Sequence, residues 1–271
     1  MFQILAERLR QGHRTSTFPK GTVQMPDHFR GLPILDETKC PEGCQSCVDA
    51  CPTDAIGHHE NALNVDLGRC LFCIECATAC PAGAVSFSQD YRLATRSRGD
   101  LITDGRTLNL ARALDDKTRR LFGRSLKLRE VSAGGCNACE ADVNVLSTLV
   151  FDLGRFGIQF VASPRHADGL LITGPVTQNM KFALQQTYEA IPSPKIVIAV
   201  GACAISGGPY IDHEQVNNGA DSVVPVDLYV PGCPPHPLTI LDGLLRLLGR
   251  LEEEPGDRRA VPRPASVAGS S

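Results

Sequence analysis

The sequence lacks a long apolar run, because charges or prolines interrupt each apolar stretch before the ~20 residues that a membrane-spanning helix needs. It also lacks an excess of either charge, since 27 basic and 30 acidic residues leave a formal net charge of -3. No basic field therefore points to nucleic acid as a partner. The N-terminal stretch MFQILAERLRQGHR has no long apolar core and no small-residue cleavage site, so we expect no secretory signal.

That N-terminal stretch instead predicts a short amphipathic helix. Phe2, Leu5 and Leu9 fall on one side of the helix, and the arginines fall elsewhere. Two interpretations are equally open. The helix packs on its own domain, or it docks on a partner protein or a membrane surface.

Cysteine, by contrast, is abundant, with 12 residues in a chain of 271. The length suggests one large domain or two modest ones, and 42% apolar residues are ample for a buried core. A secreted disulfide scaffold would be smaller and would carry a signal peptide, so metal binding explains the cysteines better. Twelve cysteines also make three sets of four.

The first third of the chain contains an internal duplication. The run CPEGCQSCVDACP at residues 40–52 is followed by the run CLFCIECATACP at residues 70–81. Three cysteines recur at a spacing of 29 residues and one at 30, so the first run carries one extra residue, which we place at Gly43. The second run matches C-x2-C-x2-C-x3-C-P, the pattern of two-cluster ferredoxins.

This spacing predicts two [4Fe-4S] clusters with crossed ligands. Three cysteines on a tight loop surround one cubane, while the fourth, which precedes a proline, reaches the other cluster. Two zinc sites are the alternative, but zinc rarely needs eight cysteines in crossed halves. The extra residue leaves a three-iron cluster open for the first site. We name the predicted ligand sets cage 1, with Cys40, Cys44, Cys47 and Cys80, and cage 2, with Cys51, Cys70, Cys73 and Cys76.

Residues 1–100 resemble the ferredoxin-like subunit of formate hydrogenlyase and its relative in respiratory complex I. The resemblance includes the N-terminal helix, FRGLPIL at 29–35, both cysteine runs and FSQDYRLAT at 87–95. It implies an α+β ferredoxin domain with two [4Fe-4S] clusters and an N-terminal docking helix. We assign this domain to residues 1–90.

Residues 91–125 contain no cysteine and are expected to form a basic connector. The stretch TLNLARALDDKTRRLFG at 107–123 spaces four leucines in a helical pattern that Gly123 ends. We expect a solvated, partly helical segment that joins two domains. The alternative is a surface that docks an acidic partner subunit.

From residue 126 to residue 254 the pattern predicts an α/β domain. Short apolar runs, typical of buried parallel strands, alternate with helical stretches. This alternation implies right-handed crossovers and a parallel, flavodoxin-like sheet that is covered on both faces. A disordered tail is expected at 255–271. We expect strands at 126–131, 158–162, 169–173, 195–200 and 226–230, and helices at 140–153, 178–191 and 237–254.

The four remaining cysteines all follow the ends of predicted strands. Each lies on a glycine-containing loop, and ligand sites in open α/β sheets form at the carboxyl edge. Three such loops would bring four thiolates together, and their glycines would let backbone N–H groups approach a cluster. We name this predicted set cage 3: Cys136, Cys139, Cys203 and Cys233.

Three chemistries fit all or part of cage 3. A redox dithiol needs only Cys136 and Cys139 and leaves the other two cysteines as coincidence. A four-thiolate zinc site fits the same four ligands. Two neighbouring ferredoxin clusters favour a third iron–sulfur cluster, because it would extend a path for electrons.

Residues 126–252 resemble the small, cluster-bearing subunit of membrane-bound energy-converting [NiFe]-hydrogenases, especially the formate hydrogenlyase type. The matching blocks are AGGCNACEAD, SPRHADGLLITGPVT, GACAISGG and VPVDLYVPGCPP. The equivalent complex I subunit shares these blocks, but its first two cysteines are adjacent, so the spacer of Asn137 and Ala138 favours the hydrogenase side. Ala138 departs from the hydrogenase relatives, which usually have glycine there.

The resemblance implies an electron-transfer subunit with three [4Fe-4S] clusters that is not catalytic alone. It also implies a large partner subunit with a nickel–iron site, membrane subunits, and a donor such as a ferredoxin-like protein or formate dehydrogenase. The chain would lie peripherally on the cytoplasmic side of the membrane. Two alternatives stay open: the same role in a complex I-like, quinone-reducing complex without nickel, and a zinc-stabilised scaffold without redox function.

The resemblance further suggests roles for residues near cage 3. Glu140 is a candidate proton relay, or an ordinary acidic residue in the first turn of a helix, where the macrodipole favours it. Arg165 and His166 line a subunit interface or a solvated loop. His236 tunes the cluster through a hydrogen bond or, as we favour, starts a helix.

Overall fold

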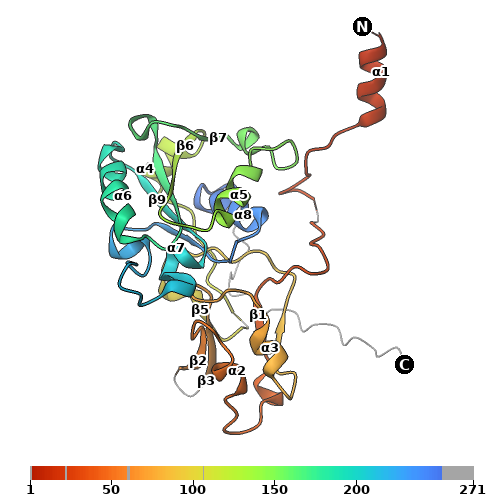
Figure 1. Ribbon diagram of the computed structural model, residues 1–271. Helices are drawn as coiled ribbons and strands as arrows, with labels where there is room; N and C mark the ends of the chain where they lie inside the picture. The colour runs from red at the N-terminus through yellow and green to blue at the C-terminus, as the bar shows by residue number, and fades with distance from the viewer. Residues whose placement is uncertain (1, 22, 60–61, 106, 252–271) are drawn as a thin grey trace.

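The computed structural model describes residues 2–21, 23–59, 62–105 and 107–251 (Figure 1). A smaller cysteine-rich body lies against a larger α/β body. The tail predicted at 255–271 lies outside the described residues, as does the end of the domain predicted for 126–254. Within the described ranges, no helix combines the length and the apolarity needed to cross a bilayer.

The cysteine-rich body is built from two small antiparallel sheets and short helices. The helices α2 (Ser46–Asp49) and α3 (Glu75–Ala79) each lie inside one cysteine run and end before its last cysteine. This arrangement confirms the α+β fold expected for the region. In the sheets, β1 (Pro33–Leu35) pairs with β4 (Val85–Phe87), and β3 (Ala62–Asp66) lies between β2 (Ile56–His59) and β5 (Ile102–Thr103).

Five parallel strands form the sheet of the α/β body, in the order β10-β9-β8-β6-β7. All residues of β8 and β9 are buried, as expected for strands that are covered on both faces. The predicted parallel α/β fold is therefore confirmed. The strands are β6 (Leu126–Ser132), β7 (Ile158–Phe160), β8 (Gly169–Thr173), β9 (Ile196–Val200) and β10 (Leu228–Val230), and the helices are α5 (Ala138–Val145), α6 (Gln178–Ala190), α7 (Ala202–Ser206) and α8 (Pro237–Leu247).

Short 3₁₀ turns connect these elements in both bodies. They are η1 (Glu37–Lys39), η2 (Gly99–Leu101), η3 (Leu153–Phe156), η4 (Pro164–His166), η5 (Gly208–Tyr210) and η6 (Ala220–Ser222).

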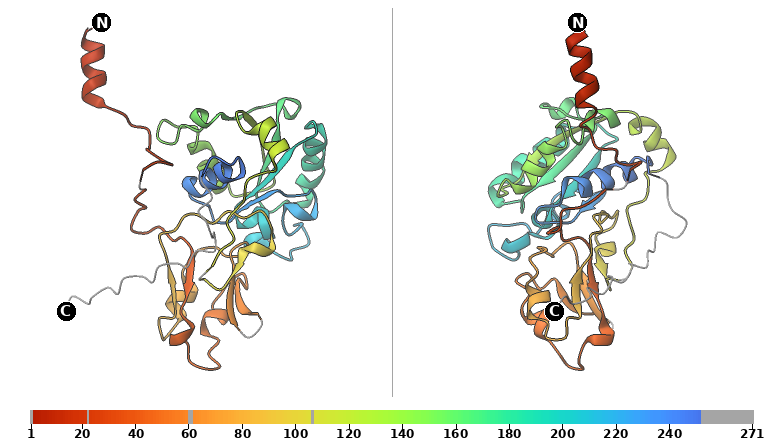
Figure 2. Two further views of the ribbon diagram at one scale, coloured as in Figure 1. Left: turned by 180° about the vertical axis from the view of Figure 1, so that it is seen from behind. Right: turned by 90° about the vertical axis from the view of Figure 1, so that its right-hand side faces the viewer.

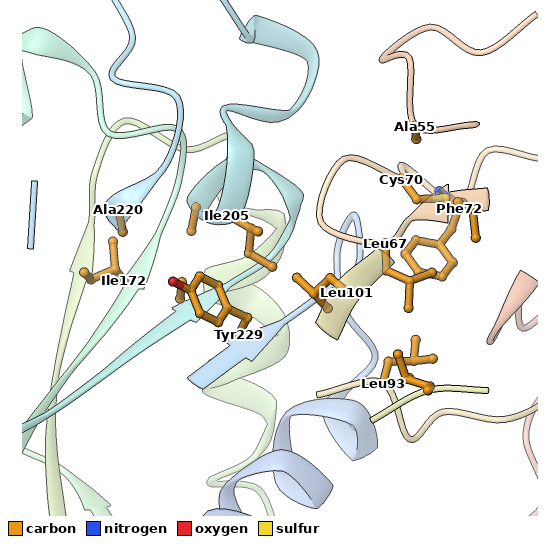
Figure 3. Packing of buried hydrophobic residues seen from close by; sticks show 14 of the residues in the cluster. Ala55, Leu67, Cys70, Phe72, Leu93, Leu101, Ile172, Ile205, Ala220 and Tyr229 are labelled. Atoms are coloured by element: carbon orange, nitrogen blue, oxygen red, sulfur yellow. Dashed lines mark hydrogen bonds between the residues drawn. The ribbon is translucent and has the colours of Figure 1, made fainter. Parts of the chain in front are cut away.

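The two faces of the large sheet carry separate buried clusters. One face packs against α5 and α8. The other face packs against α6, α7 and the cysteine-rich body, so one apolar core runs from Leu67 and Leu101 to Ile172 and Tyr229 (Figure 3). The two bodies are therefore joined through a shared core and not only through the chain between them.

The segment predicted as a solvated helical connector is mostly extended and partly buried. Among its described residues, α4 (Asp116–Phe122) is the α-helix, and the Asp115 carboxylate accepts hydrogen bonds from two N–H groups and caps its start. Upstream, Leu108 and Leu110 are buried while the residues next to each are mostly exposed, which is the alternation of an extended chain. The longer helix predicted from the leucine spacing is wrong for this reason.

Two further helices are shorter than predicted. Instead of reaching residue 153, α5 ends at Val145, where the Thr148 hydroxyl donates to the Val145 carbonyl at 2.7 Å and competes with the helical pattern. The closing helix α8 ends at Leu247 and not at residue 254. Gly249 follows with φ of 64°, the left-handed conformation that commonly ends a helix.

The N-terminal segment begins with a projecting helix and then packs along the α/β body. Helix α1 (Phe2–Gln11) contains no buried residue, and Figures 1 and 2 show it projecting away from both bodies. The prediction of an amphipathic helix is confirmed, but the interpretation that it packs on its own domain is wrong. Further along, Phe18 is buried, and the Arg155 guanidinium donates to the carbonyls of Ser16 and Phe18 at 2.8 Å each.

Candidate metal centres

Cage 1 combines the first cysteine run with the last cysteine of the second run. Cys47 is buried, and the other three side chains are partly exposed. Burial raises the pKa of Cys47, and the negative charges of Cys80, Cys40 and Cys44 raise it further. The structure therefore brings together the four side chains predicted for cage 1, across two separate runs.

The four thiols of cage 2 line one small cavity. Burial raises the pKa of Cys70 to about 12 and that of Cys76 to about 11, and the charges of other cage 2 thiols add to both shifts. The loop between them is tightly wound, with φ of 54° at Phe72 and 70° at Ile74. This conformation is costly for bulky and β-branched residues, so backbone strain is concentrated where the thiols converge.

Backbone N–H groups donate to sulfur in the same way in both cysteine runs. The Ala55 N–H donates to Cys51 Sγ at 3.1 Å, and the Ala84 N–H donates to Cys80 Sγ at 3.2 Å. Burial opposes the ionisation of Cys80, but the N–H groups of Ala84 and its neighbours hold its pKa below the ordinary value. Such bonds stabilise a thiolate ligand and tune the potential of a bound cluster.

Cage 3 is assembled from loops that follow three strands of the large sheet. β6 ends four residues before Cys136, and β9 and β10 each end three residues before Cys203 and Cys233. Because the strands are parallel, these ends meet at one edge of the sheet. Burial raises the pKa of Cys139, and the charges of Cys203, Glu140 and the other two thiols raise it further.

Glycine leaves room for the sulfur atoms of cage 3. A Cβ atom at Gly201 would lie 2.5 Å from Cys139 Sγ, and one at Gly208 would lie 2.8 Å from Cys203 Sγ. Gly201 also has φ of 92°, which side chains rarely adopt. Both the space and the backbone conformation therefore require glycine at position 201.

The C-x-x-C pair of cage 3 has the local geometry of the corresponding pair in cage 2. Asn137 has φ of 71° and ψ of 2° and precedes α5, while Ile74 has φ of 70° and ψ of 0° and precedes α3. In the first run the equivalent Gln45 has φ of -117°, and the left-handed residue is the inserted Gly43, with φ of 73°. Gly43 thus matches Phe72, the left-handed residue before Cys73, and the first run lacks only the left-handed residue that follows the cysteine.

The three cages form a row. The charge of Cys47 in cage 1 acts on Cys76 in cage 2, and the charge of Cys73 in cage 2 acts on Cys233 in cage 3. Cys73 and Cys233 also line the same pocket of about 590 Å³. Cage 2 therefore has thiols near each of the other two cages.

The donor sets fit iron–sulfur clusters better than single metal ions. Within the described ranges, no three or more His, Cys, Asp or Glu side chains converge on a position for one ion. A zinc ion holds its ligands at about 2.0–2.3 Å, whereas a cubane spreads four thiolates over its corners. Free thiols, N–H donors to sulfur and the space at Gly201 are the features that such a cluster requires.

Comparison with known proteins agrees with both halves of this geometry. Residues 32–96 match the description "4Fe-4S dicluster domain", and residues 136–247 match "NADH ubiquinone oxidoreductase, 20 Kd subunit". The probable membrane-bound hydrogenase subunit mbhJ of Pyrococcus furiosus is 43% identical over 132 residues, which are 49% of this chain and 79% of that protein. The chain belongs to the NADH ubiquinone oxidoreductase 20 kDa subunit family.

Two other relatives are matched over a smaller share of their own length. Formate hydrogenlyase subunit 7 of Escherichia coli is 47% identical over 131 residues, 48% of this chain and 51% of that protein. An NADH-quinone oxidoreductase subunit of Rubrobacter xylanophilus is 50% identical over 117 residues, 43% of this chain and 47% of that protein. The match thus spans about half the length of each of these two relatives. Together, the match to the dicluster domain and the membership of the 20 kDa subunit family identify the chain as an iron–sulfur electron-transfer subunit of the hydrogenase and complex I-like oxidoreductases.

One carboxylate, Glu140, lies beside cage 3, and a second, Glu130, lies beside Glu140. Glu140 is buried in the first turn of α5, and its carboxylate accepts a hydrogen bond from Thr173 Oγ1 at 2.7 Å. Burial opposes its ionisation, but hydrogen bonds from Ser132 and Thr173 hold its pKa below the usual value. The Glu140 side chain is therefore held in place as a carboxylate.

Glu130 is the second carboxylate, and reasoning from the sequence alone missed it. Burial raises the pKa of Glu130 to about 7, and the charge of Glu140 contributes to the shift. Its Oε1 atom is buried without a hydrogen-bond partner. Both carboxylates line a pocket of about 430 Å³. The only sequence signal was a charged residue inside the strand-like run LKLREV.

The remaining predicted residues lie at element ends. His236 is the N-cap of α8, where its Nδ1 accepts a hydrogen bond from the Leu238 N–H at 3.1 Å, so its favoured interpretation as a helix-start residue is confirmed. Burial lowers the pKa of His236. Arg165 and His166 are exposed in η4, and their assignment to a subunit interface stays a prediction.

Proposed function

We propose that the chain is an electron-transfer subunit with three [4Fe-4S] clusters in a membrane-associated, [NiFe]-hydrogenase or formate hydrogenlyase-type complex. The row of three thiol sets supports this proposal most strongly. The charge of Cys47 acts on Cys76, and Cys73 and Cys233 line the same pocket. When bound, the clusters supply one-electron chemistry, and the chain provides their order and spacing.

The proposed ligand sets follow the three cages. The chain holds cage 1 with Cys40, Cys44, Cys47 and Cys80, cage 2 with Cys51, Cys70, Cys73 and Cys76, and cage 3 with Cys136, Cys139, Cys203 and Cys233. Each set contains at least one buried thiol and others that are partly or fully exposed. The two domains would be the ferredoxin part, up to residue 90, and the α/β part, from residue 126.

The catalytic step belongs to a partner in this proposal. Formate hydrogenlyase subunit 7 and mbhJ are named as parts of larger assemblies, which supports a large subunit with nickel and iron and membrane subunits as partners. An external donor would meet cage 1, two of whose thiols, Cys40 and Cys44, line a surface pocket. The chain would lie peripherally on the cytoplasmic side, and Glu140 would relay protons beside cage 3.

A complex I-like complex without nickel is the second candidate. The 50% identity to the NADH-quinone oxidoreductase subunit of Rubrobacter xylanophilus supports it, whereas the two-residue spacer between Cys136 and Cys139 favours the hydrogenase type. The two candidates differ in their partner and share the three clusters.

Anaerobic purification of the chain with its partners tests the proposal. We expect about twelve irons and about twelve sulfides per chain, nickel in the large subunit, and hydrogen evolution with a reduced donor. Zinc in place of iron, or only about eight irons, would contradict the three-cluster assignment. Twelve irons without nickel would favour the quinone-reducing alternative.

A further inference from the structure

The turn from Asp66 to Cys70 connects cage 2 to the end of strand β3. The Asp66 carbonyl accepts hydrogen bonds from the N–H groups of Cys70 at 3.0 Å and Arg69 at 3.1 Å. The Asp66 carboxylate accepts one from the Gly68 N–H at 2.9 Å. Inside the same body, Thr53 Oγ1 donates to the Arg69 carbonyl at 2.8 Å. The position of Cys70 is therefore coupled to this turn by several bonds.

One contact joins this turn to the helix that carries a thiol of cage 3. Ser206 lies three residues after Cys203 in α7, and its hydroxyl lies 2.9 Å from the Gly68 carbonyl and 3.1 Å from the Ala202 carbonyl, as a donor to both. Both Ser206 and Gly68 are buried. Leaving the buried Gly68 carbonyl without its donor would cost free energy. This hydrogen bond therefore helps to fix the position of one body relative to the other.

A second set of contacts joins the turn to the strand before Cys233. Arg98 donates twice to the Asp66 carboxylate, at 2.8 and 2.6 Å. Three residues earlier, Thr95 exchanges backbone hydrogen bonds with Tyr229 of β10, at 3.0 and 2.9 Å. A bidentate guanidinium–carboxylate pair is directional, so the turn also has a defined orientation relative to β10.

The contact between the bodies is also close and apolar. A Cβ atom at Gly68 would lie 2.7 Å from Ile205 Cγ2 and 2.9 Å from the Arg98 guanidinium carbon. Figure 3 shows Leu67, Leu101 and Ile205 filling the space between the two bodies, and all three are almost completely buried. A glycine is therefore needed at position 68 for the bodies to approach this closely.

We infer that Gly68, Ser206 and Arg98 are positioning residues that set the separation and orientation of cage 2 relative to cage 3. The inference rests on the proposed function, because it concerns the step between the second and third clusters. These residues touch no thiol in the contacts described above. They act through the backbone of the loops that carry Cys70, Cys203 and Cys233.

The test compares Ser206→Ala and Gly68→Ala in the full, anaerobically purified chain. Gly57→Ala is the matched control, because a Cβ atom at Gly57, in β2 of the same body, would meet nothing within 4 Å. One readout is the magnetic coupling between the reduced second and third clusters, measured by electron paramagnetic resonance. The other is the exchange rate of the backbone amides of Arg69 and Cys70, measured by hydrogen exchange.

We expect both variants to keep their iron while the coupling between the second and third clusters changes. The coupling between the first and second clusters should be unaltered. In Ser206→Ala the two amides should exchange about five-fold faster, the effect of one net hydrogen bond. Gly57→Ala should match the parental chain in both readouts.

Unchanged coupling and unchanged exchange in Ser206→Ala would overturn the inference, even if Gly68→Ala fails to fold. If the parental chain holds no third cluster, the proposed function fails by itself. Amide exchange then tests the contact between Gly68 and Ser206 by itself. Equal rates in the parental chain and in Ser206→Ala would overturn the inference.

Discussion

The two cysteine-bearing bodies build their cages in opposite ways. In the small body, eight thiols come from two short runs, and in the proposed sets Cys51 and Cys80 belong with the other run. In the large body, four thiols come from three loops separated by up to 97 positions, from 136 to 233. The first design depends on local turns, whereas the second depends on a sheet that brings distant strand ends together.

Both bodies nevertheless share one local backbone conformation. A left-handed residue after the first cysteine of a C-x-x-C pair starts a helix at Ile74 and at Asn137. Cage 3 adds glycines that leave space for sulfur, such as Gly201. We therefore expect changes in the small body to affect one cage at a time through its loop, and changes in the large body to act through packing.

Removing single cysteines should have the largest effect and would test the crossed assignment. We expect Cys80→Ser to lose about four of about twelve irons and the spectrum of the first cluster, although Cys80 lies in the second run. Cys73→Ser, in the same run, should instead lose the spectrum of the second cluster. Iron analysis and electron paramagnetic resonance measure both results.

Thr78→Ala, at an exposed position between these two cysteines, is the control and should keep all irons. Cys203→Ser should lose only the third cluster. If Cys80→Ser and Cys73→Ser removed the same spectral component, the ligands would not be crossed between the runs.

Two glycine variants should separate crowding from backbone strain. Gly201→Ala would place a methyl group 2.5 Å from Cys139 Sγ, so we expect the third cluster to be lost while the first two remain. Gly43→Ala meets nothing within 4 Å but has φ of 73°, so it should cost about 1 kcal/mol of unfolding free energy and keep its iron. Iron content and denaturant titration measure these effects.

Full iron content in Gly201→Ala would show that cage 3 tolerates a shift of its sulfur. Loss of the first cluster in Gly43→Ala would show that the inserted residue shapes cage 1 directly and is not a passive extension of the loop.

Local spacing accounts for what could be predicted from the sequence. The cysteine runs and the strand ends before Cys203 and Cys233 are short-range patterns, and the fold class and the convergence of the thiols follow from them. The connector was harder, because Leu110, Leu114 and Leu121 keep a helical spacing, whereas Leu108 and Leu110, two residues apart, fit an extended chain. The contact between Gly68 and Ser206 could not be predicted from a local sequence pattern, because it forms only where two distant segments pack together.

The smallest predicted effect concerns Glu130, which has no counterpart among the residues of the small body described above. Its pKa is raised to about 7, so Glu130 stays protonated in the folded chain while the unfolded chain ionises above about pH 4.5. Folded stability therefore falls as pH rises from about 4.5 to about 7 and then stays constant. Replacing Glu130 with Gln removes this cost. Allowing for partial solvent screening, we expect Glu130→Gln to be about 1–2 kcal/mol more stable than the parental chain at pH 8.

Denaturant titrations of the full chain at several pH values from 5 to 8 would measure this difference, which should grow across the range. Glu214→Gln, at an exposed position, is the matched control and should follow the parental chain throughout. A constant difference between Glu130→Gln and the parental chain would mean that packing of the amide, and not the ionisation of Glu130, determines the effect. A loss of stability at pH 8 would mean that the Glu130 carboxylate is charged and favourably held in the folded chain.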